Sequence, residues 1–97
     1  MTYKQLIETL EMAAKYNGGL DHECFEMWAE HDEHGITFRQ TPTAEELRKL
    51  SKMGWFIGCD ALYNEEKFEK WSHCDTLTDE ELIDLFDGYD RGIFTFK

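Results

Sequence analysis

Three short motifs that start helices constrain the fold of this chain more than any other feature of its sequence. Each is a threonine followed three residues later by glutamine or glutamate: Thr2 with Gln5, Thr43 with Glu46, and Thr78 with Glu81. In this capping box, each side chain accepts a hydrogen bond from the backbone amide of the other residue, which stabilises the first helical turn. Leucines recur at helical spacing after each motif, and Gly18, Gly54 and Gly88 follow them. The sequence therefore predicts three helices.

Residues 23–32 fit both a strand and a helix, since an apolar stripe forms at either spacing. As a strand, the inward-facing residues are Phe25, Met27 and Ala29, and Trp28 faces the other way. The residues that follow favour the strand, because His34-Gly35 is typical of a turn and the short segment 36–39 begins with three β-branched or aromatic residues. We therefore predict a hairpin that turns at His34-Gly35.

Three further segments are rich in aromatic or β-branched residues. Residues 55–57 and 93–96 are predicted to be buried strands, while residues 66–73 fit a returning strand or a short helix, and we favour the strand. The element order is then α-β-β-α-β-β-α-β. It indicates an α+β fold in which three helices pack on one side of an antiparallel sheet of four to five strands. One acidic domain is expected to span residues 1–97.

The charge of the chain limits its partners. It has 21 acidic and 10 basic residues, a formal net charge of −11, with 41% hydrophobic and 14% aromatic residues. That apolar content supports a folded core, which a disordered acidic chain lacks. Nucleic acid and anionic lipid are excluded as direct partners because their phosphates are repelled. The charge favours a basic, nucleic-acid-binding protein as the partner, and we expect the chain itself to be a monomer.

Two stretches, residues 21–33 and 75–90, contain acids but no lysine or arginine. Like charges at helical spacing cost about 0.2–0.5 kcal/mol per pair, and neighbours on one helical stripe lie about 5–6 Å apart. This distance is similar to the separation of phosphates along a nucleic-acid strand. For each cluster alone, a solvated face is the alternative. The DNA-mimicking, partner-binding residues that we predict are Glu30, Asp32, Glu33, Glu80, Asp84 and Asp87.

No motif indicates a metal site or an active site. The nearest is His-Asp-Glu-His at residues 31–34, with His73-Cys74 elsewhere, but this pattern lacks the spacing of zinc ligands and falls on a predicted turn. Asp84, Asp87 and Asp90 are spaced every third residue, unlike the ligands of a calcium loop. We predict no metal, no cofactor and no enzymatic activity. A metal-dependent enzyme built on the histidines is the alternative, which metal analysis of the purified protein tests.

The cysteines and the apolar pattern indicate a cytoplasmic protein. Cys24, Cys59 and Cys74 form no close pair, so we expect buried, reduced thiols rather than disulfides. No run of about 18 apolar residues is present. The first residues enter an amphipathic helix without the apolar segment of a signal peptide.

The three tryptophans have different neighbours. Trp55 precedes Phe56 and Ile57 and is expected in the core. Trp28 and Trp71 share their elements with acids; core packing is expected for both, with an exposed anchor in a charged interface as the alternative.

The size, the charge, the α+β layout and the acid-rich faces resemble small acidic phage-encoded anti-CRISPR proteins, in particular the type I-F inhibitors that mimic DNA. The resemblance covers most of the chain but includes no diagnostic motif. It implies binding to the DNA-contacting lysine and arginine surface of a CRISPR surveillance complex, near its large subunit, in the cytoplasm of the host cell. Target DNA would then be unable to enter the surveillance complex.

The alternative is an antitoxin or immunity protein that plugs the basic active site of a nuclease. Such a plug is expected to gather its acids in one protruding element. A mimic of duplex DNA is expected to spread them along one or two long faces.

Overall fold

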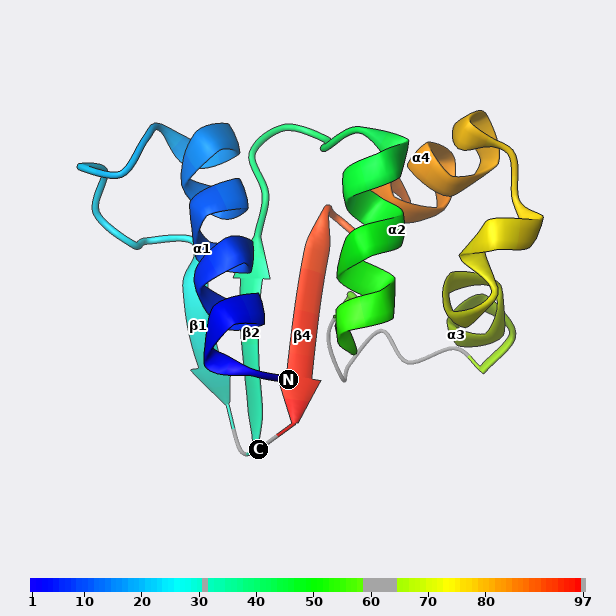
Figure 1. The fold of residues 1–97 in the computed structure, drawn as a ribbon, viewed down its shortest axis with the longest axis horizontal. Coiled ribbons are helices and arrows are strands. Elements are labelled where there is room, and N and C mark those ends of the chain that lie inside the picture. Colours follow the sequence, from blue (N-terminus) through cyan, green and yellow to red (C-terminus); the bar gives the residue numbers. More distant parts are fainter. Residues whose placement is uncertain (31, 59–64, 97) are drawn as a thin grey trace.

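Within residues 1–30, 32–58 and 65–96, which the computed structural model describes, a four-stranded sheet and four α-helices form an α+β fold (Figure 1). The side chains of Glu30 and Phe96 lie outside this description. The elements are α1 (Tyr3–Asn17), β1 (Met27–Glu30), β2 (Glu33–Thr37), α2 (Ala44–Met53), β3 (Phe56–Ile57), α3 (Glu65–Ser72), the 3-10 helix η2 (Cys74–Thr76), α4 (Asp79–Asp87) and β4 (Gly92–Phe96).

The sheet has the strand order β1-β2-β4-β3, and every neighbouring pair is antiparallel. Successive residues of a strand face opposite sides of the sheet. One row of paired residues, on the side of α1 and α2, is Met27, Ile36, Ile93 and Ile57. The row on the other side is Trp28, Gly35, Phe94 and Phe56. Phe68 of α3 packs on this second side, with its ring centroid 5.6 Å from that of Phe56, so the helices cover both sides rather than one.

All three predicted capping boxes are present, and they begin α1, α2 and α4. α1 and α2 end as predicted at Gly18 and Gly54, whose φ angles of 120° and 103° favour glycine. α4 also ends at its predicted glycine, but there the left-handed conformation falls later, on Asp90 and Arg91, both at φ 55°.

The strand predicted at residues 66–73 is wrong, because Glu65–Ser72 forms the helix α3. Phe68 and Trp71 are three residues apart, so a helix places them on the same side, whereas a strand places them on opposite sides. Trp71 is buried and stacks on Phe86 of α4, with the ring centroids 6.3 Å apart. The element order is therefore α-β-β-α-β-α-α-β, with four helices in place of three.

The predicted hairpin exists, but its turn is not at His34-Gly35, since both residues belong to β2. The chain reverses between Glu30 and Glu33 instead. Gly35 pairs with Trp28 of β1, and the indole ring covers Gly35 so closely that a methyl group there would overlap the ring. The glycine therefore allows a tryptophan to pack across the sheet rather than allowing a turn.

Met27 and Ala29 face the helices, as predicted, but they are exposed rather than buried. Phe25, which precedes β1, is 74% exposed. The core lies instead around α2, whose Leu47 and Leu50 are fully buried.

Two tryptophans are buried, and their indole N–H groups have partners inside the core. Trp55 is in the core as predicted, and its Nε1 donates to Oγ1 of Thr9 at 2.9 Å. Trp71 Nε1 donates to the backbone oxygen of Trp55 at 2.6 Å. Because Trp71 is 1% exposed, it is a core residue and not an interface anchor. These bonds connect α1 and α3 through the residue that precedes β3.

Replacing Gly35 by alanine is expected to destabilise the fold by about 1–3 kcal/mol, the usual cost of overpacking, because the added methyl group displaces the Trp28 ring. Urea unfolding measures the change in the free energy of unfolding, and tryptophan fluorescence should shift to longer wavelength. In a Trp28→Ala background the same substitution should cost little, since the methyl group then has room. An equal cost in both backgrounds would contradict the contact.

Candidate functional site

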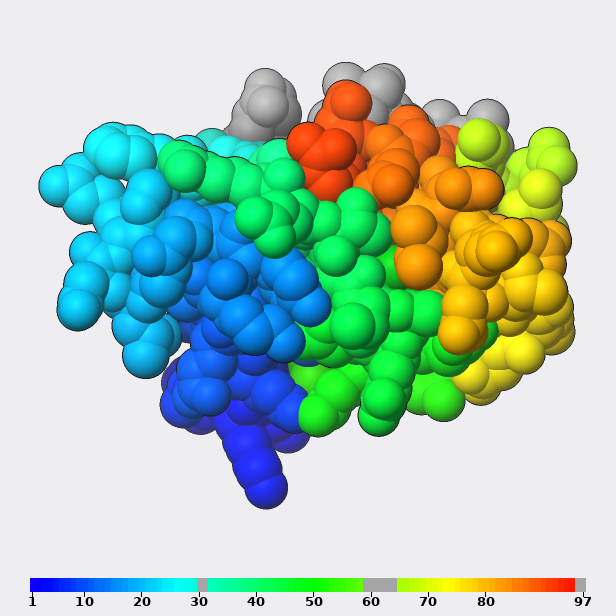
Figure 2. All heavy atoms as spheres, turned by 90° about the horizontal axis from the view of Figure 1, so that it is seen from above, coloured from blue at the N-terminus to red at the C-terminus, as the bar shows by residue number. Residues whose placement is uncertain are grey.

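The acid-rich stretch near the carboxyl terminus forms one end of the molecule. The Trp71–Phe86 contact holds α3 against α4, and α2 lies between this end and α1 (Figures 1 and 2). Residues 65–90 contain ten acids and two bases, Lys67 and Lys70. All ten acids are exposed. We term this surface the acidic end, and its acids are Glu65, Glu66, Glu69, Asp75, Asp79, Glu80, Glu81, Asp84, Asp87 and Asp90.

The basic residues of the chain are largely committed to ion pairs. Six lysines and arginines lie within 4 Å of a carboxylate: Lys15 with Glu46, Arg39 with Glu26, Arg48 with Asp79, Lys49 with Glu8, Lys52 with Asp75, and Lys70 with Glu66. Three of these pairs neutralise members of the acidic end. Among the described residues, the other seven acids of that end have no ion pair, so the end keeps a strong negative field.

Three of the predicted partner-binding residues, Glu80, Asp84 and Asp87, share one exposed stripe of α4. Asp87 accepts a hydrogen bond from the Thr41 hydroxyl, and the other two have no polar side-chain contact within the described chain. Asp84 and Asp87 lie in the last turn of the helix, which contains no basic residue. Anions at that end face the negative pole of the helix dipole, which costs about 0.3–1 kcal/mol each.

Glu81 has a different role on the same helix, since it forms the capping box with Thr78. The Thr78 backbone amide donates to Glu81 at 3.0 Å. That hydrogen bond, with the one that involves the Thr78 side chain, lowers the pKa of Glu81 below its usual value. Glu81 therefore stabilises the start of α4 and stays ionised there.

Two of the other predicted residues, Asp32 and Glu33, do not join this surface. Asp32 is exposed, but it lies in the turn between β1 and β2, on the other side of α2 from α4 (Figure 1). Glu33 is only 7% exposed, so the expectation that its side chain is exposed is wrong. It follows the turn directly and pairs with Phe96 in the sheet. The side chain of Glu30 lies outside the described residues.

Sequence reasoning missed the contribution of α3. Glu65, Glu66 and Glu69 lie on that helix and extend the acidic end beyond α4. The available signal was the helical spacing of Phe68 with Trp71 and of Glu66 with Lys70, whose charged atoms lie 3.7 Å apart. Assigning this segment to a strand removed these acids from the predicted site.

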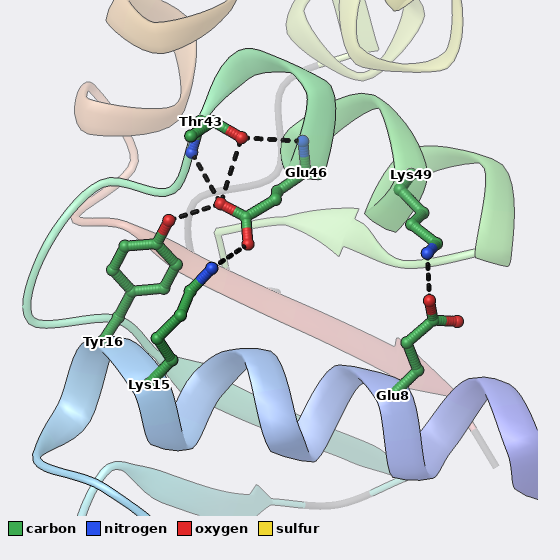
Figure 3. Close-up of polar contacts among 6 residues, drawn as sticks. All are labelled: Glu8, Lys15, Tyr16, Thr43, Glu46 and Lys49. Atoms are coloured by element: carbon green, nitrogen blue, oxygen red, sulfur yellow. Dashed lines mark hydrogen bonds and ion pairs between the residues drawn. The ribbon is translucent and has the colours of Figure 1, made fainter.

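Two carboxylates connect α1 with α2, those of Glu8 and Glu46, and Glu46 makes the larger number of contacts (Figure 3). Glu46 accepts hydrogen bonds from Lys15 Nζ at 2.6 Å and from the Tyr16 hydroxyl, and it caps α2 through Thr43. Burial opposes ionisation of Glu46, but these hydrogen bonds outweigh it and lower the pKa to about 2. Burial and the bond to Glu46 raise the pKa of Tyr16.

The described residues contain no group of three or more histidine, cysteine, aspartate or glutamate side chains that could hold a metal ion. His31, part of the histidine pair noted in the sequence, lies outside them, as does Cys59. Cys74 is buried, as expected, but Cys24 is exposed.

Comparisons of the chain with protein-family models, curated proteins and solved structures gave no match. No helix in the described part of the chain is long and apolar enough to cross a membrane.

Replacing Glu46 by glutamine is expected to lower the free energy of unfolding by about 1–2 kcal/mol at neutral pH, allowing for the solvent exposure of Lys15. The folded-state pKa of about 2 lies below the ordinary value of 4.5. The stabilisation is therefore complete above about pH 4.5 and disappears as the pH falls towards 2. Urea unfolding of the wild type and of Glu46→Gln should show that the difference between their free energies of unfolding decreases as the pH falls through this range.

Glu45→Gln is the matched control for that experiment, because Glu45 is the exposed neighbour in the same helical turn and has no ion pair among the described residues. It should change stability by no more than about 0.5 kcal/mol. A difference between wild type and Glu46→Gln that stays constant with pH would contradict the role of the Glu46 charge.

Replacing Asp84 by lysine is expected to raise the free energy of unfolding by about 0.5–1 kcal/mol. The substitution removes a repulsion from Glu80 at i−4 and places a cation at the negative pole of α4. Thermal and urea unfolding at low ionic strength measure the gain, which should decrease in high salt. A loss of stability would show that Asp84 has a structural role in the fold.

Proposed function

We propose that this chain is an inhibitor that binds the basic, DNA-contacting surface of another protein and prevents DNA from binding there. The observation that carries the proposal is the acidic end. Seven exposed carboxylates on and beside α3 and α4 have no ion pair among the described residues, because the three bases that pair with acids of this end neutralise only Asp79, Asp75 and Glu66. Such a surface attracts a dense array of lysine and arginine.

The charge density of α4 is compatible with mimicry of a nucleic-acid strand. With a rise of 1.5 Å per residue, Glu80, Asp84 and Asp87 place about one charge per 5 Å along the helix axis. A single strand of DNA carries one charge per about 3.4 Å. The exposed acids of α3, which packs against α4, add further negative charge to the same end of the molecule.

The placement of Asp84 supports a role outside folding. Its carboxylate lowers the stability of the fold because it lies at the negative pole of the helix dipole and because Glu80, four residues earlier, repels it. Charges that oppose the fold are expected where an interface uses them, since proteins give up stability at functional sites.

The target class follows from the resemblance to type I-F anti-CRISPR proteins. We propose that the partner is the DNA-contacting surface of a CRISPR surveillance complex, with the inhibitor acting as a monomer in the cytoplasm and without a cofactor. The competing proposal is an antitoxin that plugs a nuclease. The acids are spread over two helices and η2 rather than over one protruding element, which favours the duplex mimic.

The test is competition for a type I-F surveillance complex between this protein and a labelled target duplex, followed by fluorescence anisotropy. We expect the wild-type protein to displace the duplex, and the inhibition to weaken as salt rises from 50 to 300 mM, because screening acts over about 8 Å at physiological ionic strength. Glu80→Lys/Asp84→Lys should weaken inhibition at least tenfold.

Glu11→Lys/Asp32→Lys is the matched control. It changes the net charge by the same amount, at exposed acids outside the acidic end that have no ion pair in the described chain, and it should keep near-normal inhibition. Equal losses in both variants would mean that net charge, and not the acidic end, drives the effect. Failure of the wild-type protein to displace the duplex would reject this target.

A further inference from the structure

An apolar groove of about 1070 Å³ lies between α1 and the sheet, at the opposite end of the molecule from α3 and α4. The residues that line it include Tyr3, Leu6 and Leu10 of α1 and Met27, Ala29 and Ile36 of the sheet. Tyr3 is 88% exposed and Met27 is 46% exposed. The lining is mostly apolar, as is common in grooves that bind ligands or segments of other proteins.

The groove lies beside an open sheet edge. β1 is the terminal strand of the sheet, and Thr37 N donates to Glu26 O. Since hydrogen-bonded pairs alternate along an antiparallel ladder, Trp28 bonds to β2, whereas the backbone N–H and C=O of Ala29 point away from it. An edge of this kind is a template for an added strand. The side chains of Met27 and Ala29, on the same stretch of strand, face the groove.

Charge complementarity identifies the occupant. Residues 1–37, which form α1, β1 and β2, contain eight acids and two bases. Three of the acids are exposed, have no ion pair among the described residues and lie in the segments directly before and after β1: Asp21, Glu23 and Asp32. A second copy of the chain would bring another net charge of −11 against this surface. An extended segment that carries lysine or arginine has the opposite charge.

We propose that the β1 edge and the groove bind an extended segment of a partner protein in which apolar residues alternate with lysine or arginine. The segment pairs with β1 as a fifth strand, its apolar side chains enter the groove under α1, and its cations face the acids around it. Backbone pairing then supplies affinity and the groove supplies side-chain selectivity. This site is separate from the acidic end and does not depend on the function proposed for it.

The probe is a synthetic nine-residue peptide of alternating lysine and valine, with binding measured by fluorescence anisotropy and amide chemical shifts. We expect the largest shifts at Ala29 and along β1. Leu6→Ser/Met27→Ser, which removes apolar groups from the groove, should weaken binding at least tenfold. Leu20→Ser is the matched control, since Leu20 is 80% exposed and does not line the groove, and it should bind normally.

Two further peptides test the mode of binding. Methylation of alternate backbone nitrogens, on the edge that faces β1, removes donors and should abolish binding, and glutamate in place of lysine should do the same. Ala29→Pro removes the outward N–H from β1, which an edge strand tolerates, and it should weaken binding without loss of the folded spectrum.

Several results would overturn the proposal. One is that Leu6→Ser/Met27→Ser binds the lysine–valine peptide with the affinity of the wild type. The others are that the glutamate peptide binds as tightly as the lysine–valine peptide, or that a helical lysine–leucine peptide of the same charge binds more tightly. A dimer of the free chain in sedimentation equilibrium that Ala29→Pro dissociates would identify a second copy as the occupant instead. Glu80→Lys/Asp84→Lys should bind the lysine–valine peptide within about threefold of wild type, which separates this site from the acidic end.

Discussion

The shortage of cations is the constraint on which the rest of the structure depends. With 21 acids and 10 bases, the chain cannot neutralise its own surface, and its bases are used where elements must be held together. Lys15 and Lys49 pair with carboxylates between α1 and α2 (Figure 3), and Arg48 pairs with Asp79 between α2 and α4. Exposed carboxylates on α3 and α4 are left without an ion pair among the described residues, and they are available to bind a partner.

The same constraint divides the molecule into two parts of different character. Around α2, α3 and α4, large side chains such as Trp71 and Phe86 are fully buried, so apolar packing outweighs the repulsion between surface acids. On the other side of α2, α1 leaves an apolar groove above the sheet and is attached through Glu46 and the Thr9–Trp55 hydrogen bond. One part presents charge, and the other presents apolar surface and an open strand edge.

The helix starts and the acidic stripe of α4 were predictable because they depend on residues close together in the sequence. The capping boxes at Thr2, Thr43 and Thr78 determine helix starts through contacts within four residues, so sequence alone located them. The stripe of Glu80, Asp84 and Asp87 followed from the same helix. Gly35 and Glu33 depend on contacts between strands: Gly35 accommodates the Trp28 ring, and Glu33 is buried where β2 pairs with both neighbours. Such contacts leave no local pattern. For α3 a local signal did exist, the spacing of Phe68 and Trp71, but two apolar residues are too few to decide between a short helix and a strand.

Carboxylate footprinting tests the central claim most directly. The protein, free and bound to the surveillance complex, is labelled with a carbodiimide and an amine, and the modification of each acid is measured by mass spectrometry. The account predicts that Glu80, Asp84 and Glu69 are protected in the complex, while Asp32 and Glu11 react as in the free protein. Protection of Asp32 and Glu11 with full reactivity of the α3 and α4 acids would contradict it.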